Sequence, residues 1–89
     1  MIYRVLLHSK ALRELEEIDE PLRDRIREHL RELGGDPQAQ GKQLKHSEHW
    51  SLRVGDYRAV YEIWVEKRRV VVLFIGHRKN VYDDFSRLF

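Results

Sequence analysis

The stretch Leu52–Phe85, LRVGDYRAVYEIWVEKRRVVVLFIGHRKNVYDDF, decides the fold. Apolar and polar residues alternate in its first half, which is typical of strands that bury one face. Gly55 and Asp56 provide a two-residue turn signal between the first two strands. A polar connection at 66–69 leads into the uniformly apolar run 70–75, which is typical of a central strand. The stretch therefore predicts three consecutive antiparallel strands and a tail.

The first half of the chain predicts one strand and two helices. Residues 1–7 (MIYRVLL) are rich in strand-forming residues. Ser9 is the expected N-cap of the first helix, and Pro21 starts the second, because proline fits the first turn. Gly34 and Gly35 are expected to end the second helix, because glycine adopts the left-handed conformation of a C-cap. Residues 36–47 (DPQAQGKQLKHS) are polar and predict a loop.

These elements predict one α+β domain over residues 1–89, in the order β-α-α-β-β-β-α, with Asn80 capping the last helix. We expect a mostly antiparallel four-stranded sheet with a helical hairpin on one face. The alternation puts Arg53 and Arg58 together on the other face, which we expect to be open. Trp50 and Trp64 are expected to be buried, as large apolar residues usually are.

The net charge of +2 is unevenly distributed. Residues 41–79 contain nine Lys or Arg against four Asp or Glu, a balance of +5, whereas residues 1–40 have a balance of −2. A concentrated positive face attracts polyanions. There is no cysteine, and no apolar run approaches the ~20 residues of a membrane span. We expect a cytoplasmic protein without a signal peptide or a membrane partner.

The basic residues of the sheet half are candidates for binding a phosphodiester. RNA can be cut without a metal when its own 2′-hydroxyl attacks the adjacent phosphorus, provided that protein groups move two protons and stabilise the phosphorane. Arginine pairs two phosphate oxygens at once. The candidate catalytic residues are Arg53, Arg58, His77, Arg78 and Tyr82, and the candidate RNA-binding residues are Lys42, Lys45 and Lys79.

Each candidate also has a purely structural interpretation. Arg53 and Arg58 are equally compatible with ordinary solvent-facing strand positions, and Tyr82 with an anchor between a helix and the sheet. His46 and His49 are three residues apart, but no third ligand with suitable spacing accompanies them. We therefore expect no metal site and no cofactor.

Two runs strengthen the functional interpretation. Residues 52–64 (LRVGDYRAVYEIW) and 72–85 (VLFIGHRKNVYDDF) resemble the RelE branch of the RelE/ParE toxin superfamily of type II toxin–antitoxin systems. The resemblance implies a metal-independent endoribonuclease that cuts mRNA in the ribosomal A site and is neutralised by a RelB-like antitoxin. It also implies phosphate binding by Arg58, leaving-group stabilisation by Arg78, a base or orienting role for Tyr82, and a basic contact by Arg53.

The chain departs from the family pattern at two positions. Ser51 stands where some members carry a second basic residue, and Lys42 or Lys45 is a candidate to compensate. His77 replaces a lysine of some members, which leaves the acid and base open among His77, Arg78 and Tyr82. The alternatives are a ParE-like inhibitor that binds DNA gyrase, and a catalytically silent domain that binds an antitoxin.

Overall fold

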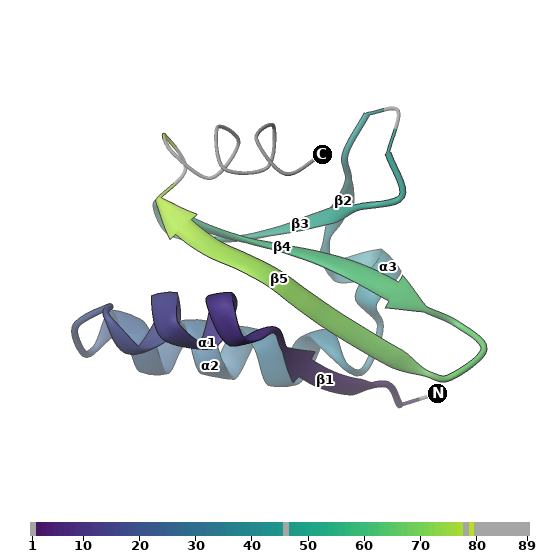
Figure 1. Cartoon of the computed structure of the whole chain (residues 1–89), viewed down its shortest axis with the longest axis horizontal. Helices are drawn as coiled ribbons and strands as arrows, with labels where there is room; N and C mark the ends of the chain where they lie inside the picture. The colour runs from purple at the N-terminus through teal and green to yellow at the C-terminus, as the bar shows by residue number, and fades with distance from the viewer. Residues whose placement is uncertain (1, 46, 78, 80–89) are drawn as a thin grey trace.

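The computed structural model describes residues 2–45, 47–77 and 79. Five strands of the described chain form one mixed sheet in the order β1-β5-β4-β3-β2. They are β1 (Arg4–Leu7), β2 (Lys42–Gln43), β3 (Trp50–Val54), β4 (Tyr57–Trp64) and β5 (Arg69–His77). β1 pairs with β5 in parallel, and the other pairs are antiparallel (Figure 1). The predicted α+β class and the three-strand meander are confirmed.

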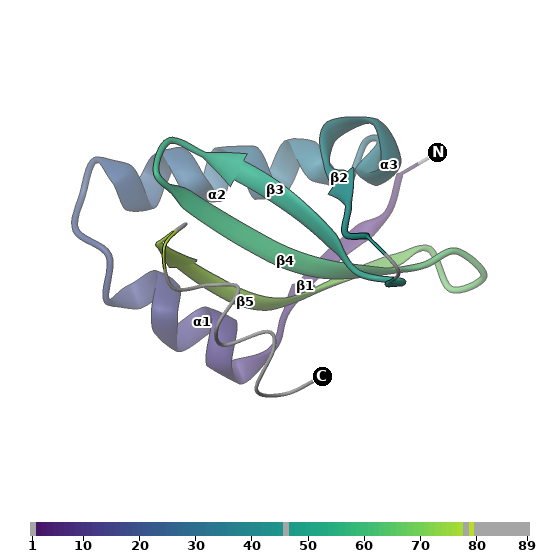
Figure 2. The same ribbon diagram turned by 90° about the horizontal axis from the view of Figure 1, so that it is seen from above.

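Two helices cover one face of this sheet. They are α1 (Ser9–Glu16) and α2 (Leu22–Leu33), and they lie beneath the strands in Figure 1 and flank the sheet in the view from above (Figure 2). A short helix, α3 (Pro37–Gln40), leads into β2 at the edge of the sheet. Within the described residues, no helix is long and apolar enough to cross a membrane.

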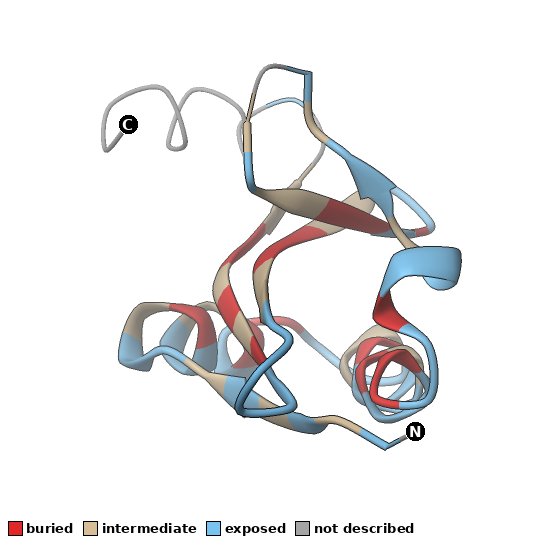
Figure 3. Ribbon diagram, turned by 90° about the vertical axis from the view of Figure 1, so that its right-hand side faces the viewer, coloured by how far each residue is buried: buried red, intermediate tan, exposed pale blue. Residues whose placement is uncertain are grey.

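The main core lies between the helices and the sheet, and buried segments occur on both helices and along the central strands (Figure 3). Its buried members are Ala11, Leu15, Ile18, Ile26, Leu30, Leu33, Leu52, Val54, Ala59, Tyr61, Val70, Val72 and Ile75. The opposite face is less open than expected. Val60 and Phe74 are buried there and pack with Leu44 and Leu73. The prediction of an uncovered face therefore holds only near the basic residues.

An irregularity between β4 and β5 determines which residues share a face. Val60 pairs with Phe74 and Tyr61 with Val72, so Leu73 is an extra residue on β5. A bulge of this kind shifts the alternation by one position. Beyond it, Gly76 lies opposite Arg58, and His77 lies opposite Tyr57 on the neighbouring row.

Two predicted helix ends are wrong in detail. The N-cap of α1 is His8, whose side chain accepts a hydrogen bond from the Lys10 N–H. Gly34 ends α2 with φ −63°, in the right-handed region. A Cβ at Gly34 would lie 2.7 Å from the Tyr3 carbonyl oxygen, so close approach to the N-terminal segment is what requires glycine.

The region predicted as a loop at 36–47 contains α3 and β2, which raises the strand count from four to five. β2 is only two residues long, and it is a strand because it pairs with β3. A polar dipeptide carries no alternation signal, so sequence reasoning missed it. The predicted C-terminal helix with its Asn80 cap, Arg78, Tyr82 and His46 lie outside the described residues.

Candidate functional site

Arg53 and Arg58 stand directly opposite each other on β3 and β4, on the face away from the helices. Side chains at such positions start about 5 Å apart, and like charges there destabilise a sheet. The Arg53 Nε donates a hydrogen bond to the Gly55 carbonyl at 2.9 Å. Gly55 has φ 61°, which suits the first position of the two-residue turn. This turn fixes the Arg53 guanidinium at the end of the sheet.

Arg58 is oriented by Ser51, which lies diagonally across from it on β3. The Arg58 Nη1 donates to the Ser51 Oγ at 3.3 Å. Ser51 is only 3% exposed, and it is the buried polar side chain of the described core. Lys42 on β2 pairs with Ser51, so it stands on the same face. Some members of the RelE branch carry a second basic residue at this position. This chain has the Ser51 hydroxyl there, with Lys42 beside it.

A hollow of about 390 Å³ opens at this place. It is lined by Lys42, Gln43, Leu44, Lys45, Ser51 and Arg58. The structure thus brings three predicted site residues, Lys42, Lys45 and Arg58, to one cavity. Arg53 is the cross-strand neighbour of Arg58. The four formal positive charges of Lys42, Lys45, Arg53 and Arg58 make it suited to an anion with several oxygens.

A buried tyrosine holds the edge of this hollow in place. The Tyr61 hydroxyl donates to the Pro37 carbonyl at 2.7 Å, and burial raises the pKa of the Tyr61 phenol. A Cβ at Gly41 would lie only 1.7 Å from the Tyr61 hydroxyl oxygen, so glycine is needed there. The contact fixes α3 and the start of β2, and hence Lys42. Sequence reasoning missed it because the partners are brought together only by the fold.

His77 is placed differently from the arginines. Its ring meets the Tyr57 ring edge-on, with centroids 5.6 Å apart and an interplanar angle of 73°. The Lys79 N–H donates to the His77 Nδ1 at 3.3 Å. The strand pairing puts His77 opposite Tyr57 and Gly76 opposite Arg58, so His77 and Arg58 lie on different faces of the sheet. The described residues therefore do not bring His77 or Lys79 into the Arg58 hollow.

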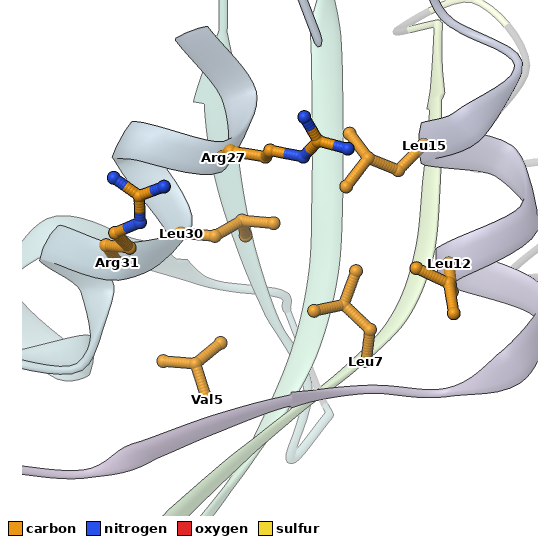
Figure 4. Close-up of a pocket in the computed structure, with 7 residues that line it drawn as sticks. All are labelled: Val5, Leu7, Leu12, Leu15, Arg27, Leu30 and Arg31. Atoms are coloured by element: carbon orange, nitrogen blue, oxygen red, sulfur yellow. The ribbon is translucent and has the colours of Figure 1, made fainter. Parts of the chain in front are cut away.

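A second hollow, of about 260 Å³, lies on the helix side of the sheet (Figure 4). Leu12 and Leu15 of α1 face Leu30 of α2 across it, and β1 borders it. Arg27 and Arg31 line it as well. Their guanidinium groups form ion pairs with Asp24 and Glu28 on the same helix. Among the residues that the structure describes, no predicted site residue lines this hollow, whose other lining side chains are leucine and valine.

Comparisons with known proteins agree with this architecture. A family model described as the ParE toxin of type II toxin–antitoxin systems, parDE, matches residues 5–82. The chain belongs to this family. The resemblance to the RelE/ParE superfamily is thereby confirmed at the level of the superfamily, and toxins of this superfamily share the fold described above. No curated protein gives a match.

Solved structures show the same fold along the chain of this ParE-family toxin. A chain of the RelBE2 toxin–antitoxin complex from Mycobacterium tuberculosis is 30% identical, with a TM-score of 0.82, over 88% of this chain and all of that one. A free Escherichia coli RelE carrying two arginine-to-alanine substitutions is 24% identical, with a TM-score of 0.79, over the full length of both chains. The YoeB/ParE toxin from Agrobacterium tumefaciens is 19% identical, with a TM-score of 0.71, over 83% of this chain and 96% of that one.

Proposed function

We propose that this ParE-family toxin is a ribosome-dependent mRNA endoribonuclease. The observation that supports the proposal is the cluster of Lys42, Lys45 and Arg58 around one hollow, with Arg53 opposite Arg58. Two arginines side by side on a sheet cost stability, and a bound phosphate removes that cost by neutralising them.

In the proposed reaction the 2′-oxygen of one nucleotide attacks the adjacent phosphorus, and the bond from phosphorus to the 5′-oxygen breaks. The products are a 2′,3′-cyclic phosphate and a 5′-hydroxyl end. A base takes the 2′ proton, and an acid protonates the 5′-oxygen. Arg58, oriented by Ser51, stabilises the charge of the phosphorane together with Arg53. His77, Arg78 and Tyr82 are the candidates for proton transfer, and Lys42, Lys45 and Lys79 for backbone binding.

The proposal includes partners. The similar structure from Mycobacterium tuberculosis is a toxin–antitoxin complex, and a similar structure from Pyrococcus horikoshii is a RelE–RelB complex. By that likeness we propose a RelB-like antitoxin for this chain, which neutralises it by covering the basic hollow. The substrate complex is the mRNA on the ribosome, which places the reaction in the cytoplasm. No step of the reaction calls on a metal ion or a cofactor.

The decisive experiment is toeprinting on programmed ribosomes with the wild type and Arg58→Ala. We expect cleavage to fall by roughly 100- to 1,000-fold, the usual cost of removing one transition-state donor. Arg58→Lys should recover only part of the activity, since an ammonium cannot pair two oxygens. Arg25→Ala, an exposed arginine of α2 on the far side of the sheet, is the matched control and should cleave normally. Full cleavage by folded Arg58→Ala refutes the assignment.

A second candidate is inhibition of DNA gyrase by binding. It is favoured by the family model, whose description names the ParE toxin. A supercoiling assay with purified gyrase separates the two functions. Inhibition of supercoiling by the wild type, without cleavage of ribosome-bound mRNA, supports the second candidate. Cleavage without inhibition supports the first.

A further inference from the structure

The β4–β5 hairpin presents an aromatic side chain to solvent at the end of the sheet far from Arg58. Trp64 is 43% exposed and the following Val65 is 56% exposed, so the predicted burial of Trp64 is wrong. The hairpin projects past the helices near the N-terminus (Figures 1 and 2). Its turn is exposed throughout (Figure 3). An exposed tryptophan on a projecting hairpin is available to stack on a ligand.

Positive charge surrounds this tryptophan. Lys67, Arg68 and Arg69 follow it in the turn and at the start of β5, and Arg4 lies beside Arg69 in the parallel pairing of β1 with β5. The Lys67 Nζ is 5.6 Å from the centroid of the Trp64 ring, within the range of a cation–π contact. Within the described residues, no salt bridge joins any of these four cations to a carboxylate.

Arg68 occupies a backbone position that disfavours arginine. Its φ is 51°, in the left-handed region, where glycine or asparagine fits at lower cost. The turn is nevertheless well fixed. The Arg68 N–H donates to the Val65 carbonyl at 3.1 Å, and the Arg68 carbonyl accepts from the Arg4 N–H at 2.9 Å. A strained residue in a fixed turn points to a use for its side chain.

We propose that the tip of the β4–β5 hairpin is a second binding site, for single-stranded RNA. One base stacks on Trp64 by displacing the Lys67 ammonium from the ring, and the backbone phosphates on either side bind Lys67, Arg68, Arg69 and Arg4. Aromatic stacking combined with a cationic rim is the usual means of binding single strands without sequence preference. The four cations outnumber the two acidic residues nearby, Glu62 and Glu66, which favours a polyanion over an apolar protein partner.

The site is separate from the proposed reaction site. Trp64 is six residues from Arg58 along β4, which corresponds to roughly 20 Å at the rise of a strand. Alternation along β4 puts both residues on the same face, with Glu62 and the buried Val60 between them. A single strand is therefore able to reach both sites, but each site binds through its own residues. The inference does not depend on the cleavage chemistry.

The test uses the full chain with Trp50→Phe, which leaves Trp64 as the sole tryptophan. Arg58→Ala in the same background removes the proposed phosphate contact in the other site. The probe is a fluorescein-labelled 2′-O-methyl oligonucleotide, which lacks the 2′-hydroxyl nucleophile. We expect the oligonucleotide to quench Trp64 fluorescence, and its affinity to fall steeply with salt. Binding that leaves Trp64 fluorescence unchanged overturns the proposal.

Two variants make the test quantitative. Trp64→Leu keeps an apolar side chain but cannot stack, and we expect at least about fivefold weaker binding, whereas Trp64→Phe should bind nearly normally. Arg68→Gly relieves the backbone and removes a cation. It should melt at or above the parent temperature, yet bind more weakly and with a salt slope reduced by about one. Unchanged affinity in both Trp64→Leu and Arg68→Gly refutes the site.

The source of the RNA is decided by pelleting with ribosomes. If the hairpin binds ribosomal RNA, Trp64→Leu and Arg68→Gly reduce pelleting with ribosomes that carry no mRNA. If it binds mRNA, they reduce pelleting only with programmed ribosomes. Either result supports the site. Variants that pellet normally with both but lose a co-expressed protein partner overturn it in favour of a protein-docking surface. Normal oligonucleotide binding together with absent cleavage contradicts the proposed nuclease function alone.

Discussion

The two faces of the sheet are built for different purposes. Thirteen buried core residues lie between the sheet and the helices α1 and α2, seven of them on the strands, whereas the described residues of the opposite face include only three buried ones, Ser51, Val60 and Phe74. That opposite face holds the Arg53–Arg58 pair and the Lys42 side of the hollow. Burial of apolar surface is the main source of stability. One face therefore provides most of the stability, and the other carries the cations of the proposed binding site.

The contrast predicts that a truncation in the helix-side core lowers stability far more than a truncation on the opposite face. Leu33 is fully buried, so Leu33→Ala should lower the free energy of unfolding by about 2–5 kcal/mol. Arg53→Ala removes one of two facing cations and should change stability by less than about 0.5 kcal/mol. Urea denaturation of both variants measures the difference. Destabilisation of Arg53→Ala comparable to that of Leu33→Ala would contradict the division between the faces.

The division between the faces was largely predictable from the sequence, because alternation in strands assigns side chains to faces. Tyr57 and Ala59 fall on one side and Arg58 on the other, and the turn at Gly55 sets their register. The proximity of Lys42 to Arg58 was not predictable. It depends on the two-residue strand β2, which has no pattern of its own and exists by pairing with β3.

The bulge at Leu73 and the exposure of Trp64 were not predictable either. The run at 70–75 is apolar at every position, so nothing in it marks where the alternation shifts. Trp64 is a residue type that is usually buried, but it lies near the end of β4 on the face away from the helices, where it is 43% exposed. The bulge depends on how β5 pairs with β4, and the exposure of Trp64 depends on what packs against that end of the sheet, neither of which local sequence specifies.

The contact between Tyr61 and Gly41 links the two faces, and the next prediction tests that link. Gly41→Ala places a methyl group 1.7 Å from the Tyr61 hydroxyl oxygen, and the fully buried ring has no space to retreat into. We expect a loss of about 1–3 kcal/mol, as for overpacking of a core. Gly35→Ala is the matched control, because Gly35 is exposed and its added Cβ meets only the Glu32 carbonyl at 3.3 Å.

The double variant Gly41→Ala/Tyr61→Phe sharpens this test. Removal of the hydroxyl eliminates the shortest contact and leaves the ring carbon at 2.8 Å. The double variant should therefore lose less stability than the sum of the losses in the two single variants. Strict additivity would mean that the added methyl group and the hydroxyl do not meet. Cleavage measured in parallel should fall in Gly41→Ala, because the displaced segment contains Lys42, which lines the hollow.

The smallest expected effect is that of Tyr61→Phe, which removes one hydrogen bond and leaves the packing intact. The loss of the bond to the Pro37 carbonyl should cost about 1 kcal/mol near neutral pH.

Because burial raises the pKa of this phenol, the folded protein holds the proton more tightly than the unfolded chain. The stability that depends on the proton is fully present below the unfolded pKa of ~10, and it is lost as pH rises above that value. The advantage of the wild type over Tyr61→Phe in urea midpoint should therefore be constant up to about pH 10 and shrink above it. An advantage that persists unchanged at higher pH would show that Tyr61 ionises as readily folded as unfolded, and that the helix-side face does not enclose its hydroxyl.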